Sequence, residues 1–231
     1  MRHSSAKTEP PISLKLSHSN LYENLFLIDF EMPYIQKGMS INSRWSQMTA
    51  DLSKIDYSVE RRLNRDLLSQ LVTCDFILDK KNLSILGAAG SGKSFFAKAF
   101  GVEACHNLHR TKYFNANRFL NDLYDLSIQD QKRYKRKLGY YQRLPVLILD
   151  DWLMFPINNP VKESILLDLI DARYGQTTTI VCSQVDPDDW CEKFSGYTVG
   201  NAITSRLVSN GFSLVIQCAE DLRQTKYPGV L

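Results

Sequence analysis

Hydrophobic and polar positions alternate along most of the chain in the way that encodes a parallel α/β sheet. Beyond an amphipathic segment at 59–73, short apolar runs bounded by turn residues are separated by longer segments with helical periodicity. We expect strands at 83–86, 111–114, 145–150, 177–182 and 212–217. We expect helices at 59–73, 93–108, 117–128, 161–174, 187–193 and 198–207. The alternation predicts an α/β fold, with a five-stranded parallel sheet sandwiched by helices.

The first part of the chain follows a different pattern. It holds Pro10 and Pro11, scattered Ser and Asn, and one apolar stretch at 21–30 that stops before Pro33. No periodicity there is long enough to define an element. We therefore predict a small N-terminal region over 1–52 and one larger domain over 53–231.

Composition narrows the class of protein. The 231 residues are 44% hydrophobic and 23% charged, which is typical of a globular chain with a buried core. The longest purely apolar runs have four residues, whereas a membrane span needs about 20. The polar N-terminus has no apolar signal segment, so we predict a cytoplasmic protein with no membrane partner. Five scattered cysteines without a C-x-x-C pair are interpreted as core thiols.

A glycine-rich segment between the first strand and the next helix has the pattern G-x-x-x-x-G-K-[ST]. It consists of Gly87, Ala88, Ala89, Gly90, Ser91, Gly92, Lys93 and Ser94. Glycines let the backbone curl so that several N–H groups point at one anion, at a helix start whose dipole favours negative charge. We predict that this loop binds the phosphates of ATP. Lys93 would reach the β- and γ-phosphates and the Ser94 hydroxyl would ligate Mg²⁺.

A second candidate site follows the apolar strand 145–150. Four apolar residues lead into Asp150 and Asp151, and buried carboxylates need a partner. Asp150 is predicted to hold the Mg²⁺ shell, and Asp151 to orient or deprotonate the water that attacks the γ-phosphate. Ser183 and Gln184 end another strand, where either side chain could contact the γ-phosphate; Ser183 is preferred.

Four segments together resemble IstB-like ATP-binding proteins, which belong to the IstB/DnaC group of AAA+ ATPases. They read GAAGSGKSFFAKAFGVEA, LPVLILDDW, LLDLIDARYGQTTTIVCSQVDPDDW and NAITSRLVSNGFSLVI, and the resemblance covers about 53–217. It implies a fold without a C-terminal helical lid and an ATPase that serves a transposase or loads a replicative helicase. Trp152 and the DPDDW stretch ending at Trp190 favour the transposition branch.

The resemblance also implies an arginine finger at Arg206, which would reach ATP held by a neighbouring subunit of a homo-oligomer. Arg173 is a second candidate, expected instead to pair with Asp168 or another carboxylate. Asp151 stands where many AAA+ proteins have Glu, so slow hydrolysis is expected. The longer basic N-terminal domain of the family is not matched by 1–50, which raises the alternatives of a truncated copy, a copy frameshifted near its start, or a divergent branch.

Basic charge is concentrated at 132–143. This stretch has no acidic residue, and without its six cations the net charge of the chain would be −3 rather than +3. Such a segment could be a solvated surface helix, but beside the family resemblance we predict that it contacts double-stranded DNA through phosphates. The residues are Lys132, Arg133, Lys135, Arg136, Lys137 and Arg143.

Three alternatives remain open at the level of sequence. A DnaC-like helicase loader would share the same ATPase core. A P-loop kinase for a small metabolite would need a substrate-binding insertion and an Arg-rich lid. A nucleotide-binding scaffold would change its assembly state without useful turnover. A metal site at Cys105, His106 and His109 is not expected, since these residues lie at a helix end.

Overall fold

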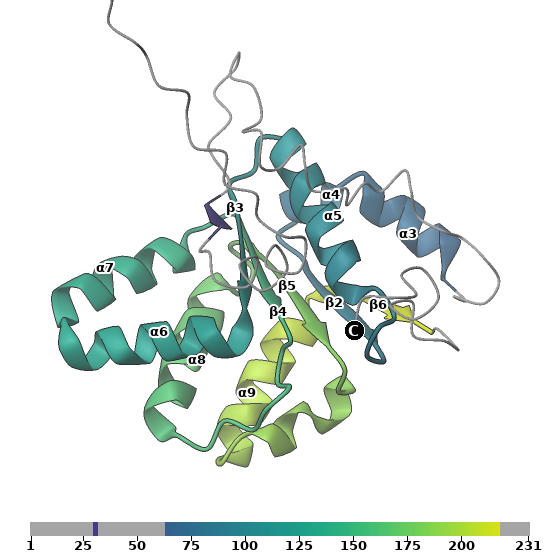
Figure 1. Ribbon diagram of the computed structural model, residues 1–231. Helices are drawn as coiled ribbons and strands as arrows, with labels where there is room; N and C mark the ends of the chain where they lie inside the picture. Colours follow the sequence, from purple (N-terminus) through teal and green to yellow (C-terminus); the bar gives the residue numbers. More distant parts are fainter. Residues whose placement is uncertain (1–29, 32–62, 218–231) are drawn as a thin grey trace, which may run out of the picture.

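A six-stranded sheet forms the centre of the computed structural model, which describes residues 30–31 and 63–217 (Figure 1). The strand order is β1-β3-β4-β5-β2-β6. Strands β2 to β6 are all parallel, which confirms the predicted five-stranded parallel sheet, and β1 pairs antiparallel with β3. The strands are β1 (Phe30–Glu31), β2 (Asn82–Gly87), β3 (Thr111–Asn115), β4 (Val146–Asp150), β5 (Thr178–Ser183) and β6 (Gly211–Ile216). Strand β1 was not predicted, and most of 1–62 lies outside the described residues.

Helices cover both faces of the sheet. They are α3 (Arg65–Val72), α4 (Asp75–Leu78), α5 (Lys93–His106), α6 (Ala116–Gln129), α7 (Gln131–Gln142), α8 (Pro160–Arg173), α9 (Tyr197–Val208) and the 3-10 helix η3 (Pro187–Lys193). The predicted helix 59–73 corresponds to α3 where it is described. Helix α7 has no counterpart among the expected elements, because only its Leu138 and Tyr141 are buried.

Two hydrophobic cores form because successive side chains of each strand point to opposite faces. In β4, Val146 and Ile148 pack with α3, α4 and α5. Leu147 and Leu149 pack with α6, α7, α8 and α9 on the other face. Strands buried on both faces are almost purely apolar, which is why their positions could be predicted from the sequence.

Helices α6 and α7 form a hairpin that projects from one side of the sheet (Figure 1). Asp130 alone separates the two helices, and its side chain caps α7 by accepting the N–H of Arg133 at 2.9 Å. The base of the hairpin is held by aromatic contacts of Tyr141 with Phe114 and Phe119, whose ring centroids lie 5.4 and 5.0 Å away. The hairpin also contacts α8, where the Lys162 ammonium donates to Asn121 of α6 at 2.7 Å and Gln142 of α7 donates to the Asp168 carbonyl at 3.2 Å.

A buried tryptophan pair joins η3 to the loop after β4. The Trp152 and Trp190 rings are 6.0 Å apart in an edge-on arrangement, and each is at most 2% exposed. The Trp190 indole N–H donates to the carbonyl of Val185 at 2.9 Å. Within the described ranges, no helix is long and apolar enough to cross a membrane.

Candidate nucleotide-binding site

The glycine-rich loop leaves the carboxyl end of β2 and runs into α5. Gly87 has φ +155°, and a Cβ atom at this position would lie 2.5 Å from the carbonyl oxygen of Ile216 in β6. Gly92 has φ +96° and is the N-cap residue of α5. Backbone space at Gly87 and left-handed geometry at Gly92 therefore require residues without a side chain.

The start of α5 fits an anion. No side chain caps Gly92, so the first-turn N–H groups lack the usual capping acceptor. Lys93 is 7% exposed, and its ammonium donates to the Ala88 carbonyl across the loop at 2.7 Å. The buried Ser91 hydroxyl has no hydrogen-bond partner among the described residues. An uncapped helix start, a nearby ammonium and an unused hydroxyl together suit the phosphates of a nucleotide.

The acidic pair lies at the same edge of the sheet, at the end of β4. The Asp150 carboxylate is 5% exposed and accepts hydrogen bonds from the Tyr113 hydroxyl and from the N–H of Asp151. Asp151 has φ +54°, so the chain turns sharply after the strand. Its Oδ2 accepts from Nδ2 of Asn115 at 2.9 Å. Two β3 side chains thus hold the two carboxylates, because β3 pairs with β4 and Asn115 lies opposite Asp150.

The strand β5 lies between β2 and β4 and connects the loop to the acidic pair. The buried Cys182 thiol is 3.9 Å from the Lys93 carbonyl and interacts with the Asp150 carboxylate. Burial raises the pKa of Cys182, and the negative charge of Asp150 raises it further. Burial and Asp150 also raise the pKa of Tyr113. Both groups therefore stay protonated at neutral pH, and the Tyr113 hydroxyl donates to Asp150.

Ser183 and Gln184, the two polar residues that follow Cys182, differ in burial. Ser183 is buried, and its hydroxyl donates to the Trp152 carbonyl at 2.9 Å and accepts the Val185 N–H at 3.1 Å. Gln184 is exposed. In this conformation Ser183 braces the loop after Asp151, and the phosphate-sensing role of either residue stays a prediction.

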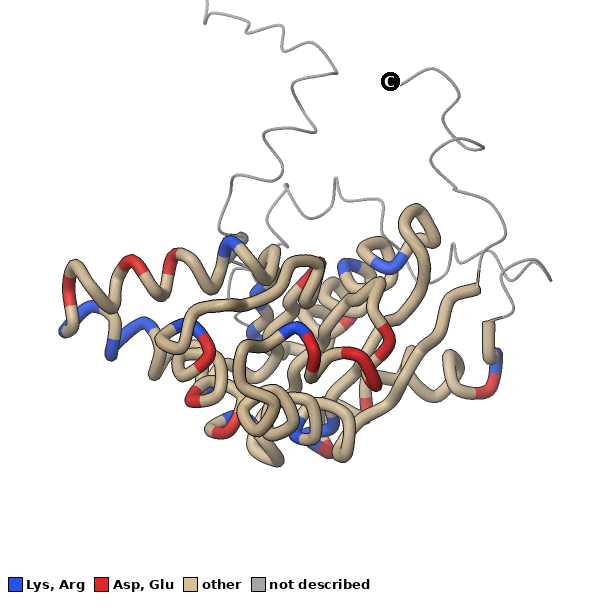
Figure 2. Tube along the Cα trace, turned by 90° about the horizontal axis from the view of Figure 1, so that it is seen from below, with Lys and Arg blue, Asp and Glu red and all other residues tan. Residues whose placement is uncertain are grey.

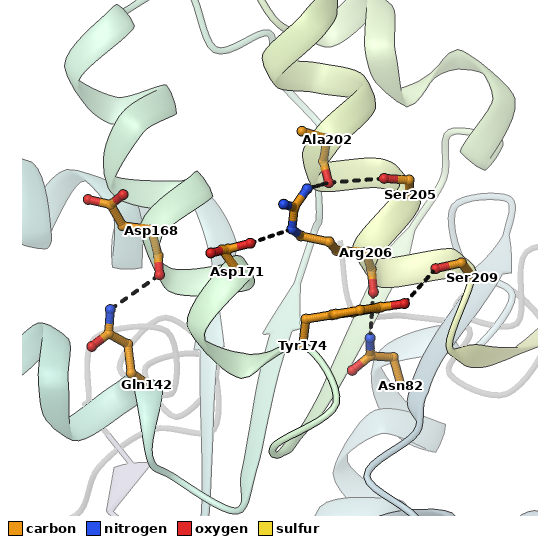
Figure 3. A network of polar contacts seen from close by, with 9 residues as sticks. All are labelled: Asn82, Gln142, Asp168, Asp171, Tyr174, Ala202, Ser205, Arg206 and Ser209. Atoms are coloured by element: carbon orange, nitrogen blue, oxygen red, sulfur yellow. Dashed lines mark hydrogen bonds and ion pairs between the residues drawn. The ribbon is translucent and has the colours of Figure 1, made fainter.

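Arg206 lies far from this edge. The Asn82 side chain, at the start of β2, donates to the carbonyls of Arg206 and Leu207 at 3.0 and 3.3 Å (Figure 3). The loop begins at Gly87, at the other end of the same strand. Five residue steps along a strand span about 16 Å. Arg206 and the phosphate-binding loop of one chain are therefore separated by the length of the sheet.

The prediction that Arg173 pairs with a carboxylate is wrong. It is 1% exposed, and its guanidinium donates to the Thr179 hydroxyl and to the carbonyls of Tyr141, Leu144 and Thr178. Burial lowers the pKa of Arg173 to about 9. Its neutral partners tie the end of α7 to the start of β5, so Arg173 is a structural residue that cannot reach another molecule.

The predicted basic segment forms α7 and the residue that follows it. Lys132, Arg133, Lys135, Arg136 and Arg143 are exposed, and Lys137 is half-buried with its ammonium 6.0 Å from the Tyr141 ring centroid. Figure 2 shows these cations along one helix of the hairpin, while acidic residues lie along the other. The structure thus concentrates the basic side chains on an exposed, projecting helix.

Sequence reasoning missed Tyr113, Asn115 and Cys182 as neighbours of the acidic pair. Asn115 could have been noticed, since a polar residue ends a strand expected beside Asp150. Tyr113 and Cys182 carry no such signal, because an aromatic residue and a thiol in apolar strands are typical of a core.

The fold and this arrangement define a P-loop nucleotide-binding protein of the AAA+ type. The crystal structure of DnaI superposes with a TM-score of 0.63 at 20% identity, covering 77% of this chain and 95% of that chain. The crystal structure of the DnaC helicase loader gives a TM-score of 0.58 at 18% identity, covering 75% of this chain and 98% of that chain. At these identities the likeness concerns the fold.

Sequence comparison identifies the family. The model of the family described as "IstB-like ATP binding protein" matches residues 31–226. An insertion sequence ATP-binding protein of Sinorhizobium fredii is 36% identical over 74% of this chain and 69% of its own length. The ATP-binding protein of insertion sequence IS21 from Pseudomonas aeruginosa is 27% identical over 85% of this chain and 74% of its own length. The chain belongs to the IstB-like ATP-binding protein family, which confirms the predicted resemblance.

Proposed function

We propose that this protein is an ATPase that assembles on double-stranded DNA as a homo-oligomer and delivers or activates the transposase of an insertion sequence. The observation that carries the proposal is the placement of Arg206 and the phosphate-binding loop at opposite ends of β2. One chain cannot bring both groups to the same ATP. A second copy, docked head to tail, could supply Arg206 to the nucleotide of the first.

Within one subunit, the loop 87–92 and Lys93 would bind the phosphates of ATP. Mg²⁺ bound with the nucleotide would neutralise charge on the β- and γ-phosphates. Ser94 and Asp150 are the residues that would hold it. Both Asp150 oxygens already accept hydrogen bonds within the chain, so its contact with the ion is expected to pass through water.

Hydrolysis would begin at Asp151, whose carboxylate accepts a hydrogen bond from the attacking water. The water oxygen forms a bond to the γ-phosphorus while the bond to the β–γ bridging oxygen breaks, and the proton that the water loses passes through Asp151 to solvent, yielding ADP and phosphate. Arg206 of the neighbouring copy would stabilise charge on the transferring group. Asp151 is held by Asn115, and its side chain is shorter than Glu, so turnover is expected to be slow until assembly aligns the site.

The α6–α7 hairpin is the proposed DNA contact. Five of the six predicted cations are exposed, and phosphate contacts of this kind carry little sequence information. We expect duplex DNA to gather several copies along its length and so raise the concentration of interfaces that pair a loop with an arginine.

The oligomer is tested first by light scattering. Mass is measured with ADP or a slowly hydrolysed ATP analogue, with and without random-sequence duplex, for wild type and Arg206→Ala. Large assemblies that need both the analogue and DNA, and that are lost in Arg206→Ala, support the proposal. A monomer under every condition would overturn it.

DNA contact is tested by the salt dependence of binding. Changing Lys132, Arg133, Lys135 and Arg136 to Gln should reduce the slope of log K against log salt by about 3.6 if each contacts one phosphate. The matched control changes Lys80 and Lys81 to Gln, which are remote from the hairpin, and should leave the slope unchanged. An unaltered slope in the α7 variant would remove this helix from the DNA interface.

Helicase loading is the second candidate, favoured by the fold shared with the DnaC helicase loader. The two partners are separated by a binding competition. A purified insertion-sequence transposase and a purified replicative helicase are each titrated onto the ATP-bound, DNA-bound protein. Saturable binding of the helicase alone would replace the transposition assignment.

A further inference from the structure

Arg206 is held by groups from two helices. Its Nε donates to Oδ1 of Asp171 in α8 at 2.6 Å, and Nη1 donates to the Ala202 carbonyl one turn earlier in α9 at 2.8 Å (Figure 3). A guanidinium has five N–H donors, and only two of them are used by these contacts. The Nη2 end makes no hydrogen bond to the described part of the chain.

The backbone of Arg206 is fixed as well. Asn82 is 5% exposed, and its amide donates to the Arg206 carbonyl while its oxygen accepts the Thr179 N–H at 2.9 Å. The last turn of α9 is thereby tied to two central strands, β2 and β5. Both the main chain and the guanidinium of Arg206 are ordered before any partner arrives.

We infer that Asp171 is a positioning residue for Arg206, acting across the interface between two copies. It binds Nε and leaves the Nη groups available for the γ-phosphate of ATP held by the neighbouring subunit. This inference rests on the proposed function, because it assumes that Arg206 acts on a neighbour's nucleotide. It adds that the acidic residue on α8 belongs to the ATPase machinery, although it never touches the nucleotide.

The exposure of the pair favours orientation over stability as the role of Asp171. The Asp171 side chain is 60% exposed and that of Arg206 32% exposed, and ion pairs at such sites stabilise a fold little. A long side chain that is already held loses less rotational freedom when it binds phosphate. Removing Asp171 should therefore leave folding intact and weaken catalysis at the interface.

The first test is steady-state ATPase activity with duplex DNA. In Asp171→Asn and Asp171→Ala, kcat should fall about tenfold to a hundredfold, because a misplaced group loses that much. KM for ATP should stay unchanged, since the loop is intact. Asp171→Glu should recover part of kcat. The matched control is Asp168→Ala, one turn earlier on α8, whose carboxylate makes no hydrogen bond to the described residues. It should behave as wild type.

The second test asks whether Asp171 works through Arg206. If it does, adding Asp171→Ala to Arg206→Ala should cause no further loss of kcat.

A third test, the mixing of variant subunits, shows whether Asp171 acts across an interface between two copies. Asp171→Ala keeps an intact loop, and Lys93→Ala keeps an intact Arg206 and Asp171. In a one-to-one mixture of these two weakly active variants, an interface is intact only where the loop of an Asp171→Ala copy meets Arg206 and Asp171 of a Lys93→Ala copy. Random head-to-tail pairing makes about a quarter of the interfaces of this kind, so the mixture should recover activity in that proportion.

The outcomes separate the inference from the function beneath it. If Arg206→Ala is inactive while Asp171→Ala keeps wild-type kcat, or gains activity because a restraint is released, the inference is overturned and the proposed function stands. If Arg206→Ala keeps wild-type kcat, both fail. Circular dichroism melts accompany each variant, and Asp171→Leu, which preserves size and removes both acceptor oxygens, decides the question should Asp171→Ala unfold.

Discussion

The two ends of β2 hold their functional groups in different ways. At the carboxyl end, Lys93 and Asp150 are less than a tenth exposed and are fixed by contacts within the chain. At the amino end, Arg206 is half-buried and its carboxylate partner Asp171 lies mostly in solvent. The first end resembles a finished binding site, whereas the second resembles one half of an interface. Under the proposed function, nucleotide binding is a property of one chain and efficient hydrolysis requires two.

The largest effect is expected where the loop meets β6. In Gly87→Ala the new Cβ would overlap the backbone carbonyl of Ile216, at a φ that L-residues rarely adopt. Overpacking and backbone strain together should cost roughly 4 kcal/mol of unfolding free energy. Urea denaturation measures the loss. Gly175→Ala is the control, because nothing lies within 4 Å of its added Cβ, although its φ of +64° brings a smaller strain of its own. Equal losses in the two variants would contradict the close approach.

The second largest effect is expected on ATP affinity, from a change at the carboxyl end of β2. Lys93→Ala should weaken binding of ATP by about 3 kcal/mol, roughly a hundredfold, because it removes the buried ammonium beside the phosphates. Calorimetric titration with a slowly hydrolysed analogue measures it. Lys81→Ala, which changes a partly exposed lysine just before β2, should bind like wild type. In contrast, Arg206→Ala should bind the analogue normally as a monomer. A large loss of monomer affinity in Arg206→Ala would contradict the division between the two ends.

A smaller effect is expected from removing Asn82, which holds the backbone of Arg206 at the amino end of β2. Asn82→Ala leaves the buried Thr179 N–H and the last carbonyls of α9 without their side-chain partner. The free energy of unfolding should fall by about 2 kcal/mol. Because the Arg206 backbone loses its tie, kcat with DNA should fall while monomer affinity for ATP does not. Asn82→Asp, which keeps the acceptor for Thr179, should retain part of the stability.

The smallest effect concerns the joint between the hairpin and the acidic pair. The Asn115 oxygen accepts the Arg118 N–H at the start of α6, while its amide donates to Asp151. Asn115→Ala should lose about 1 kcal/mol of stability with the cap. Asn115→Asp keeps the cap and removes the donor to Asp151. Comparing the thermal melts and the ATPase rates of the two variants separates the cap from the carboxylate contact. Identical behaviour in both assays would show that only one of these contacts matters.

Much of the fold could be predicted from the sequence because its signals are local. Apolar runs such as 145–150 are strands buried on both faces, and the glycines of 87–92 mark a loop that only small residues can form. Helix α7 escaped prediction because just two of its residues are buried. The partners of Arg173 could not be predicted either, since they are mostly backbone carbonyls brought together by folding. Asp171 gave no signal for the same reason, as its partner Arg206 is 35 residues away in the chain.

The tryptophan pair gives the protein a built-in optical reporter. Trp152 directly follows the acidic pair, and its backbone N–H donates to the Cys182 carbonyl at 2.7 Å. Its indole ring packs edge-to-face against the buried Trp190 ring. A shift of the backbone at Asp151 therefore changes the separation of two indoles that are shielded from solvent quenchers. We therefore expect events at the γ-phosphate to change the intrinsic fluorescence of a Trp45→Phe variant, in which these two indoles are the only ones, on the timescale of a stopped-flow mixer.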